Sequence, residues 1–150
     1  MSIEINDQPH VHAELIIKWV RNPSGVKVWR WNDFDIKWVL DTVFVWDVNM
    51  IYAISDEVPH LPIPSCKYPT GTIEFPVPVS NYEEINGKDA LYLVELSGVH
   101  EIFSTNTNIP KYIKLGQLQT SRPKAKIQHD AFMEFLENES KKWSKFAYYK

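Results

Sequence analysis

The sequence has little cysteine, few glycines and no long apolar run. Its 150 residues include one cysteine, Cys66, so neither an internal disulfide nor a cysteine-based zinc site can form. The five glycines are not clustered, which argues against a glycine-rich phosphate loop. Apolar runs such as Val43–Trp46 are far shorter than the ~20 residues of a membrane-spanning helix. We therefore expect no membrane span, and a reducing compartment fits.

The composition is that of a folded protein. Hydrophobic residues make up 44% of the chain and charged residues 23%, a balance that supports a buried core. The length suits one ordinary domain or two small modules. Residues Met1–Asp7 contain neither a basic nor an apolar segment, so we expect no secretory signal and a cytoplasmic location.

Charge is distributed unevenly along the chain. Residues 1–110 hold 7 Lys/Arg and 15 Asp/Glu, whereas residues 111–150 hold 9 Lys/Arg and 4 Asp/Glu. The balances of −8 and +5 together give the net charge of −3. A basic C-terminal region can attract an anionic partner, or it can simply complement the acidic remainder.

The first regular element is predicted to be a helix. Pro9 suits a first helical turn, and Pro23 cannot continue a helix. Between them lies an apolar stripe with helical spacing: Val11, Leu15, Ile16, Trp19 and Val20.

A small antiparallel meander is expected after this helix. Four short segments are rich in β-branched and aromatic residues: Val26–Trp31, Ile36–Leu40, Val43–Trp46 and Met50–Ile54. The alternation of Ile36, Trp38 and Leu40 predicts the sheet face that packs on the helix. Helix and meander would form a first module over residues 1–55.

A proline-rich joint and a second module are expected to follow. Prolines recur through residues 56–80, which we interpret as an extended joint with an edge strand at Thr72–Phe75. Residues 81–150 would form the second module. Its expected elements are strands at Ala90–Leu96 and Val99–Phe103, a short strand at Tyr112–Leu115 or Gln117–Thr120, and an amphipathic helix capped by Ser121 and running to about Trp143. The predicted fold class is therefore α+β, with two small modules.

No catalytic or metal-binding constellation stands out in the sequence. His10 and His12 would lie ~200° apart on a helix, so they converge poorly on a metal. Neither His100 nor His129 is followed by the Thr or Ser that a two-histidine phosphoesterase motif requires. Cys66 lacks an evident activating base and is interpreted as a passive thiol. We therefore expect no catalytic residue, no metal and no cofactor, and a protein that is not an enzyme.

Tryptophan is concentrated in the first 46 residues. Five of the six tryptophans lie there, and a small module cannot bury so many large rings completely. One alternative is an exposed aromatic patch that binds a protein or a stacked base: Trp29, Arg30, Trp31, Trp38 and Trp46. The other alternative, of equal weight, is a core built from oversized side chains.

Basic residues gather near the start of the last predicted helix. Their spacing resembles a strip that contacts phosphates more than one that reads bases: Lys111, Lys114, Arg122, Lys124 and Lys126. The tryptophans lie in the acidic part of the chain, so aromatic rings and positive charge do not coincide. We expect nucleic-acid binding to be weak or absent.

The run from His10 to Trp19, followed by a strand pair and by Trp46 and Tyr52, resembles a module of small accessory proteins of tailed bacteriophages. Those proteins commonly open with a His-Ala-x-x-Ile-x-x-Trp helix before a Trp/Tyr-rich sheet. The strand pair Ala90–Phe103 and the helical segment Ala125–Leu136 resemble their C-terminal module. This chain departs from the pattern at Asn22–Pro23, where a Gly-rich step is usual. It also lacks the usual Asn-Pro-Ser/Thr-Trp segment before the last strand.

The resemblance implies a phage-encoded protein that acts in the bacterial cytoplasm on host metabolism, transcription or defence, and it implies no catalytic residue. We expect stoichiometric binding to a host protein, with inhibition of a defence system as one form of it. One alternative is a pocket that sequesters a nucleotide-like small molecule through Trp29, Arg30 and Trp31. Another alternative is a nucleic-acid-associated regulatory protein.

Overall fold

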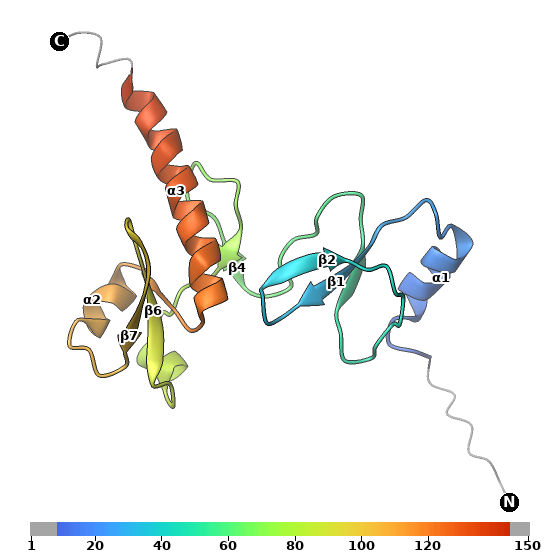
Figure 1. Cartoon of the computed structure of the whole chain (residues 1–150), viewed down its shortest axis with the longest axis horizontal. Helices are drawn as coiled ribbons and strands as arrows, with labels where there is room; N and C mark the ends of the chain where they lie inside the picture. The colour runs from blue at the N-terminus through green and yellow to red at the C-terminus, as the bar shows by residue number, and fades with distance from the viewer. Residues whose placement is uncertain (1–8, 145–150) are drawn as a thin grey trace, which may run out of the picture. The chain divides into compact units, whose positions relative to one another are not determined.

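The computed structural model describes residues 9–144, and the chain divides into two compact units, residues 1–60 and 61–150. Each unit contains helix and antiparallel sheet, so the fold class is α+β, as predicted. Figure 1 labels the elements along the chain. The division at residue 60 means that most of the proline-rich stretch belongs to the second unit.

Within residues 9–60, unit 1 contains one helix and a three-stranded antiparallel sheet. Helix α1 spans Ala13–Arg21, and the strands are β1 (Val28–Asn32), β2 (Lys37–Leu40) and β3 (Tyr52–Ile54). The strand order is β2-β1-β3, so β1 is central and the expected meander order is wrong. Two predicted elements also differ: the helix begins at Ala13 instead of near Pro9, and Val43–Trp46 is not a strand.

Backbone geometry explains why Val43–Trp46 does not form a strand. Phe44 and Trp46 have φ angles of 58° and 56°, which lie in the left-handed region and outside the β region. The Asp41 carboxylate accepts hydrogen bonds from the backbone N–H groups of Val43 and Phe44. A side chain that bonds nearby N–H groups in this way offers the backbone a turn in place of a strand ladder.

The core of unit 1 lies between α1 and one face of the sheet. Val28 and Ile54 are paired in register and contact this core, as does Tyr52. The buried members of the core are Val28, Trp46 and Tyr52, and the half-buried side chains packed on them are Leu15, Ile16, Trp19, Phe44, Met50 and Ile54. Of the predicted helical stripe, Val11 and Val20 stay exposed.

The sheet face expected to pack on the helix was predicted wrongly. Trp38 is paired with Trp31, and their rings meet edge to face at 5.4 Å. Because side chains alternate along a strand, these two rings lie on the face opposite Val28 and Tyr52. Leu40 at the end of β2 is exposed.

The described part of unit 2, residues 61–144, contains two sheets and three helical segments. The first sheet pairs β4 (Ser65–Cys66) with β5 (Phe75–Pro76), and the second has the order β7-β6-β8. The remaining elements are η1 (Tyr82–Ile85), β6 (Ala90–Glu95), β7 (Gly98–Phe103), α2 (Ile109–Lys114), β8 (Leu118–Gln119) and α3 (Arg122–Ser144).

The predicted hairpin and C-terminal helix are confirmed, and Ser121 Oγ accepts a hydrogen bond from the Lys124 N–H, as a cap does. Of the two places suggested for a short strand, the one inside Gln117–Thr120 is correct, and Tyr112–Leu115 is wrong. Residues 109–114 are helical, with Pro110 in the first turn, where its missing N–H costs nothing.

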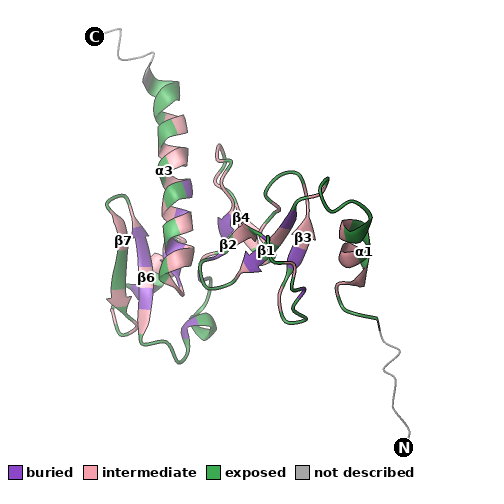
Figure 2. Ribbon diagram, turned by 45° about the vertical axis from the view of Figure 1, so that its right-hand side comes forward, coloured by how far each residue is buried: buried purple, intermediate pink, exposed green. Residues whose placement is uncertain are grey.

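The three-stranded sheet of unit 2 lies between α2 and α3 (Figure 1). Alternate residues of β6 face opposite layers: Leu91 and Leu93 join Ile109 of α2 in the core, whereas Tyr92 lies beneath Arg122 of α3. Figure 2 shows the resulting contrast between the largely buried β6 and the more exposed β7. The buried residues on the α2 side are Val79, Ile85, Leu91, Leu93, Ile109 and Leu118.

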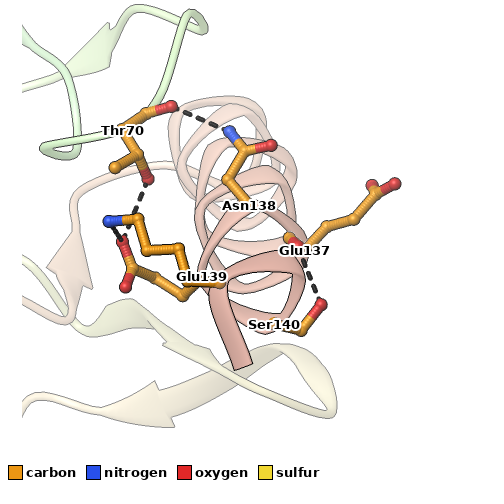
Figure 3. A network of polar contacts seen from close by, with 6 residues as sticks. Thr70, Glu137, Asn138, Glu139 and Ser140 are labelled. Atoms are coloured by element: carbon orange, nitrogen blue, oxygen red, sulfur yellow. Dashed lines mark hydrogen bonds and ion pairs between the residues drawn. The ribbon is translucent and has the colours of Figure 1, made fainter. Parts of the chain in front are cut away.

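Residues 68–76 pack against α3, so the proline-rich stretch is not a separate joint along its whole length. Tyr68 contacts the rings of Phe132 and Phe135, with centroid distances of 5.8 and 5.4 Å. Nearer the helix end, the Asn138 amide donates to the Thr70 carbonyl oxygen at 2.8 Å (Figure 3). The edge strand expected at Thr72–Phe75 forms only at Phe75–Pro76.

A buried amide pair joins α3 to the rest of unit 2. Gln119 and Gln128 are 2% and 1% exposed, and Gln119 Nε2 donates to Gln128 Oε1 at 2.8 Å. Gln119 also donates to the Pro76 carbonyl oxygen, and Gln128 donates to the Gly116 carbonyl oxygen and to the Tyr68 hydroxyl. Every amide N–H of the pair thus serves a fold contact.

Candidate functional site

A hollow in unit 1 brings together polar groups from the central strand and from the loop between β2 and β3. We call it the Arg30 hollow. Its volume is about 270 Å³, and its lining residues are Arg30, Asp41, Val43, Val45, Asp47, Met50 and Tyr52. A second hollow of about 510 Å³ shares Arg30 and Met50 and is lined also by Trp31, Asn32, Asp33, Asn49 and Ile51.

Two aspartates fix the loop that forms one wall of the Arg30 hollow. Asp41 Oδ1 accepts from the N–H groups of Val43 at 3.1 Å and Phe44 at 3.3 Å. Asp47 Oδ1 accepts from the Asn49 N–H at 2.8 Å, and the Asp47 N–H donates to the Tyr52 hydroxyl at 2.9 Å. These Asp-centred turns hold both ends of the loop.

Side chains in the middle of the loop alternate between core and solvent. Phe44 stacks on Trp19 with a centroid distance of 4.7 Å, and Trp46 is 7% exposed. Val43 and Val45 are 73% and 71% exposed. Two inward rings therefore anchor a segment that presents two valines outward. The left-handed backbone at both aromatic residues is strained, and strain of this kind concentrates at functional sites.

The Asp41 Oδ2 atom and the Arg30 guanidinium have no hydrogen-bond partner in the part of the chain that the structure describes. Asp41 is 8% exposed, and its Oδ2 atom accepts no hydrogen bond from residues 9–144. The Arg30 guanidinium is exposed, and within the same residues it forms no hydrogen bond and no ion pair. A buried carboxylate oxygen without a donor is costly, so Asp41 Oδ2 offsets part of the stability that the Asp41 Oδ1 hydrogen bonds contribute.

The predicted aromatic patch is divided between two faces of the sheet. Trp29 and Trp31 share the face opposite α1, whereas Arg30, which pairs with Tyr52, lies on the α1 side. A single site that combines Trp29, Arg30 and Trp31 is therefore not formed. Trp46 belongs to the core beneath α1.

The three rings on the far face are largely satisfied within unit 1. Trp31 is 3% exposed. The indole N–H groups of Trp29 and Trp38 donate to the carbonyl oxygens of Ser55 and His60, each at 2.9 Å. For these rings and for Trp46, the geometry favours the alternative of a core built from oversized side chains.

The predicted basic strip is also divided. Lys111 and Lys114 belong to α2, whereas the other three residues, Arg122, Lys124 and Lys126, belong to α3 on the opposite side of the sheet. Arg122 lies 3.5 Å from the Glu101 carboxylate and 5.2 Å from the centre of the Tyr92 ring. Its charge is thus already partly matched inside unit 2.

The histidine pair and the cysteine contribute fold contacts. His12 Nε2 lies 3.1 Å from the Asp47 carbonyl oxygen, and its ring meets Tyr52 edge-on at 4.8 Å. Burial raises the pKa of the Cys66 thiol, which lowers the thiolate fraction at neutral pH.

Residues 9–144 contain neither a metal-binding cluster nor a membrane-spanning helix. Over that range, no three His, Cys, Asp or Glu side chains are grouped so that they could hold a metal ion. None of the helices described there combines the length and the hydropathy that crossing a membrane requires.

Sequence reasoning identified Arg30 but missed most of its neighbours in the hollow. The available signals were Asp41, which follows one predicted strand, and Asp47–Asn49, which separates two predicted strands. Comparison of the chain with protein-family models, with curated proteins and with solved structures finds no match. The roles of these residues therefore rest on geometry alone.

Proposed function

We propose that this protein acts by binding another protein stoichiometrically, through a surface formed by Val43, Val45 and Val48. We call this the valine loop surface. The observation that carries the proposal is that all three side chains are exposed on the connection between β2 and β3, whose backbone is held by hydrogen bonds to Asp41 and Asp47. Apolar side chains gathered at the surface mark interaction sites.

The fixed loop lowers the cost of association. A segment that is already held in one conformation loses little conformational entropy when a partner covers it. Phe44 and Trp46 hold the loop from beneath, while the valines remain available. Burying two valines against a partner contributes about 2 kcal/mol or more, which corresponds to roughly thirtyfold in affinity.

The resemblance to tailed-phage accessory proteins suggests what the partner is. We propose a host protein in the bacterial cytoplasm, and a component of a defence system is the form of partner that a stoichiometric inhibitor would need. The first experiment is therefore the recovery of this host protein.

Affinity capture from bacterial lysate with the full chain tests the proposal. We expect one protein to co-purify at a fixed ratio with the unaltered chain, and the double variant Val43→Ser/Val45→Ser to lose roughly thirtyfold in affinity for it. Val58→Ser is the matched control, because Val58 is also exposed in unit 1 but lies outside the loop.

Retention of the captured protein by the double variant would contradict the valine loop surface. Equal loss with Val58→Ser would contradict it as well. Failure of the unaltered chain to capture any protein at a fixed ratio would contradict stoichiometric protein binding itself.

A further inference from the structure

We infer that the outer edge of β7 binds an extended segment of a partner protein as an added antiparallel strand, with a basic residue of that segment opposite Glu101. This goes beyond the valine loop surface, because it lies in unit 2 and depends mainly on backbone atoms. The sheet order β7-β6-β8 leaves β7 with one strand neighbour among residues 61–144. An edge strand presents N–H and C=O groups to a chain that lies beside it.

The hydrogen-bond pattern of the hairpin shows which backbone groups of β7 face β6. The Ser104 N–H donates to the Asp89 carbonyl oxygen at 3.1 Å, next to the end of the hairpin ladder. Bonded pairs in an antiparallel ladder recur at every second residue. The backbone groups of His100 and Ile102 are therefore directed toward β6.

The alternate residues of β7, namely Val99, Glu101 and Phe103, direct their backbone groups away from β6. The Phe103 carbonyl oxygen accepts a hydrogen bond from the Asn106 N–H at 3.0 Å. Within residues 9–144, no hydrogen bond reaches the other outward groups, which are the N–H and C=O of Val99 and Glu101 and the N–H of Phe103. These groups repeat at intervals of about 6.8 Å, the spacing that a second extended chain matches.

The side chains at the same positions indicate what the added strand carries. Glu101 is paired in register with Tyr92, whose ring lies beneath Arg122, so Val99, Glu101 and Phe103 all lie on the α3 face of the sheet. Phe103 is 77% exposed, and the Glu101 side chain is 54% exposed. Side chains directly opposite each other on neighbouring strands interact, so apolar residues fit opposite Val99 and Phe103 and a basic residue fits opposite Glu101.

The position of Glu101 also argues against a second copy of this chain as the occupant. In the antiparallel register of fullest overlap between two β7 strands, each Glu101 lies opposite the Glu101 of the other copy. Like charges directly opposite each other are destabilising, and a charge on an edge strand is a common means of preventing self-association. A shifted register would place Glu101 opposite Val99 or Phe103 and would shorten the ladder. A different chain with a basic residue at this position fits better.

Hydrogen exchange of the full chain, followed by nuclear magnetic resonance, tests the inference with the synthetic peptide acetyl-Thr-Val-Thr-Lys-Thr-Val-Thr-amide. We expect the Val99 and Glu101 N–H groups to exchange rapidly in the free chain and to become protected when the peptide is added. The N–H groups of His100 and Ile102 should be protected in both states. No protection at Val99 and Glu101, or protection only at other residues, would overturn the site.

Two altered peptides separate the contribution of charge from that of the backbone. Glutamate in place of the lysine should weaken binding roughly tenfold, because it sets a like charge opposite Glu101. Methylation of the lysine backbone nitrogen should abolish binding, because it removes the donor to the Glu101 carbonyl oxygen. Equal binding of the glutamate peptide would overturn the basic residue, and full binding of the methylated peptide would overturn strand addition.

Glu101→Pro is the matching variant of the chain. Proline removes the outward N–H and leaves the hairpin hydrogen bonds in place, as it does on edge strands generally. We expect Glu101→Pro to abolish peptide binding, whereas the control Glu101→Gln keeps the N–H and should bind the lysine and glutamate peptides almost equally. Unchanged binding by a folded Glu101→Pro chain would contradict the inference. If that variant does not fold, the methylated peptide provides the same test on the unaltered chain.

Sedimentation equilibrium without peptide tests the second copy as the occupant. We expect Glu101→Pro to leave the oligomeric state unchanged. A dimer of the unaltered chain that Glu101→Pro dissociates would overturn the partner segment and assign the edge of β7 to self-association.

Discussion

The core of unit 1 and the core on the α2 side of unit 2 are built from different side chains. Unit 2 places aliphatic side chains between its sheet and α2, as Leu91, Leu93 and Leu118 show, and keeps the rings of Tyr68, Phe132 and Phe135 for its contact with α3. Unit 1 relies on aromatic rings, and two of them, Phe44 and Trp46, come from an irregular loop. Regular elements satisfy their own backbone groups, whereas an irregular loop needs side chains such as Asp41 to do so.

The difference shows how a small sheet can support an irregular loop. The strands of unit 1 are short, and its loop adopts strained backbone angles. Large rings beneath the loop supply buried apolar area that short strands cannot. Unit 2 shows no comparable strain among the residues described, because its positive φ angles fall on glycines.

The largest expected effect comes from removing an aromatic anchor of unit 1. Trp46→Ala should destabilise this unit by about 3–5 kcal/mol, because it empties a large volume beneath α1. Chemical denaturation should be followed in a Trp143→Phe background, in which every tryptophan belongs to unit 1. We expect the fluorescence midpoint to fall while the helical circular dichroism, to which the 23 residues of α3 contribute most, keeps its midpoint. If the fluorescence and circular dichroism midpoints fell together, the two units would not unfold independently.

A smaller effect is expected from the buried amide pair of unit 2. Gln128→Ala removes the hydrogen bonds to Gly116 and Tyr68 and leaves the buried Gln119 amide short of a partner. We expect a loss of about 2–3 kcal/mol, seen as a lower midpoint of the helical signal with an unchanged tryptophan midpoint. Lys126→Ala on the same helix should change stability by less than ~0.5 kcal/mol. Equal effects of the two variants would show that the amide pair contributes little.

The smallest effect depends on pH. Hydrogen bonds from the Thr72 backbone N–H and hydroxyl lower the pKa of the Glu134 carboxyl. A lowered pKa in the folded chain means that the stabilisation is present at neutral pH and is lost as pH falls through that pKa. Glu134→Gln should therefore lower the melting temperature at pH 7 and have no effect near pH 2, with Glu137→Gln as the control. If Glu134→Gln still melted at a lower temperature than the unaltered chain near pH 2, the stabilisation would not depend on the ionised carboxylate of Glu134.

Local sequence signals predicted much of unit 2. The hairpin followed from alternating residues around Ser97–Gly98, and α3 followed from the Ser121 cap and its apolar spacing. Contacts within a hairpin or a helix are close in sequence, so local patterns largely determine them.

The features of unit 1 that were predicted wrongly depend on contacts between residues that are far apart in the sequence. Nothing local indicates that β3 pairs with β1 instead of extending a meander. Val43–Trp46 has the composition of a strand, but the Asp41 cap and the burial of Phe44 against Trp19 override that preference. Side chains alternate between the two faces of a strand, so the sequence itself places Arg30 on the face opposite Trp29 and Trp31. The predicted aromatic patch combined all three residues and did not take this alternation into account.

The alternation in the loop has a practical consequence for engineering. Randomising Val43 and Val45 while keeping Phe44 and Trp46 would vary what the chain presents to its surroundings and leave the supporting rings in place. Neighbouring positions of this loop thus differ in what they determine: Val43 and Val45 determine the exposed surface, whereas Phe44 and Trp46 support the fold. A library of variants at Val43 and Val45 could therefore be selected for new binding partners while the fold of unit 1 is retained.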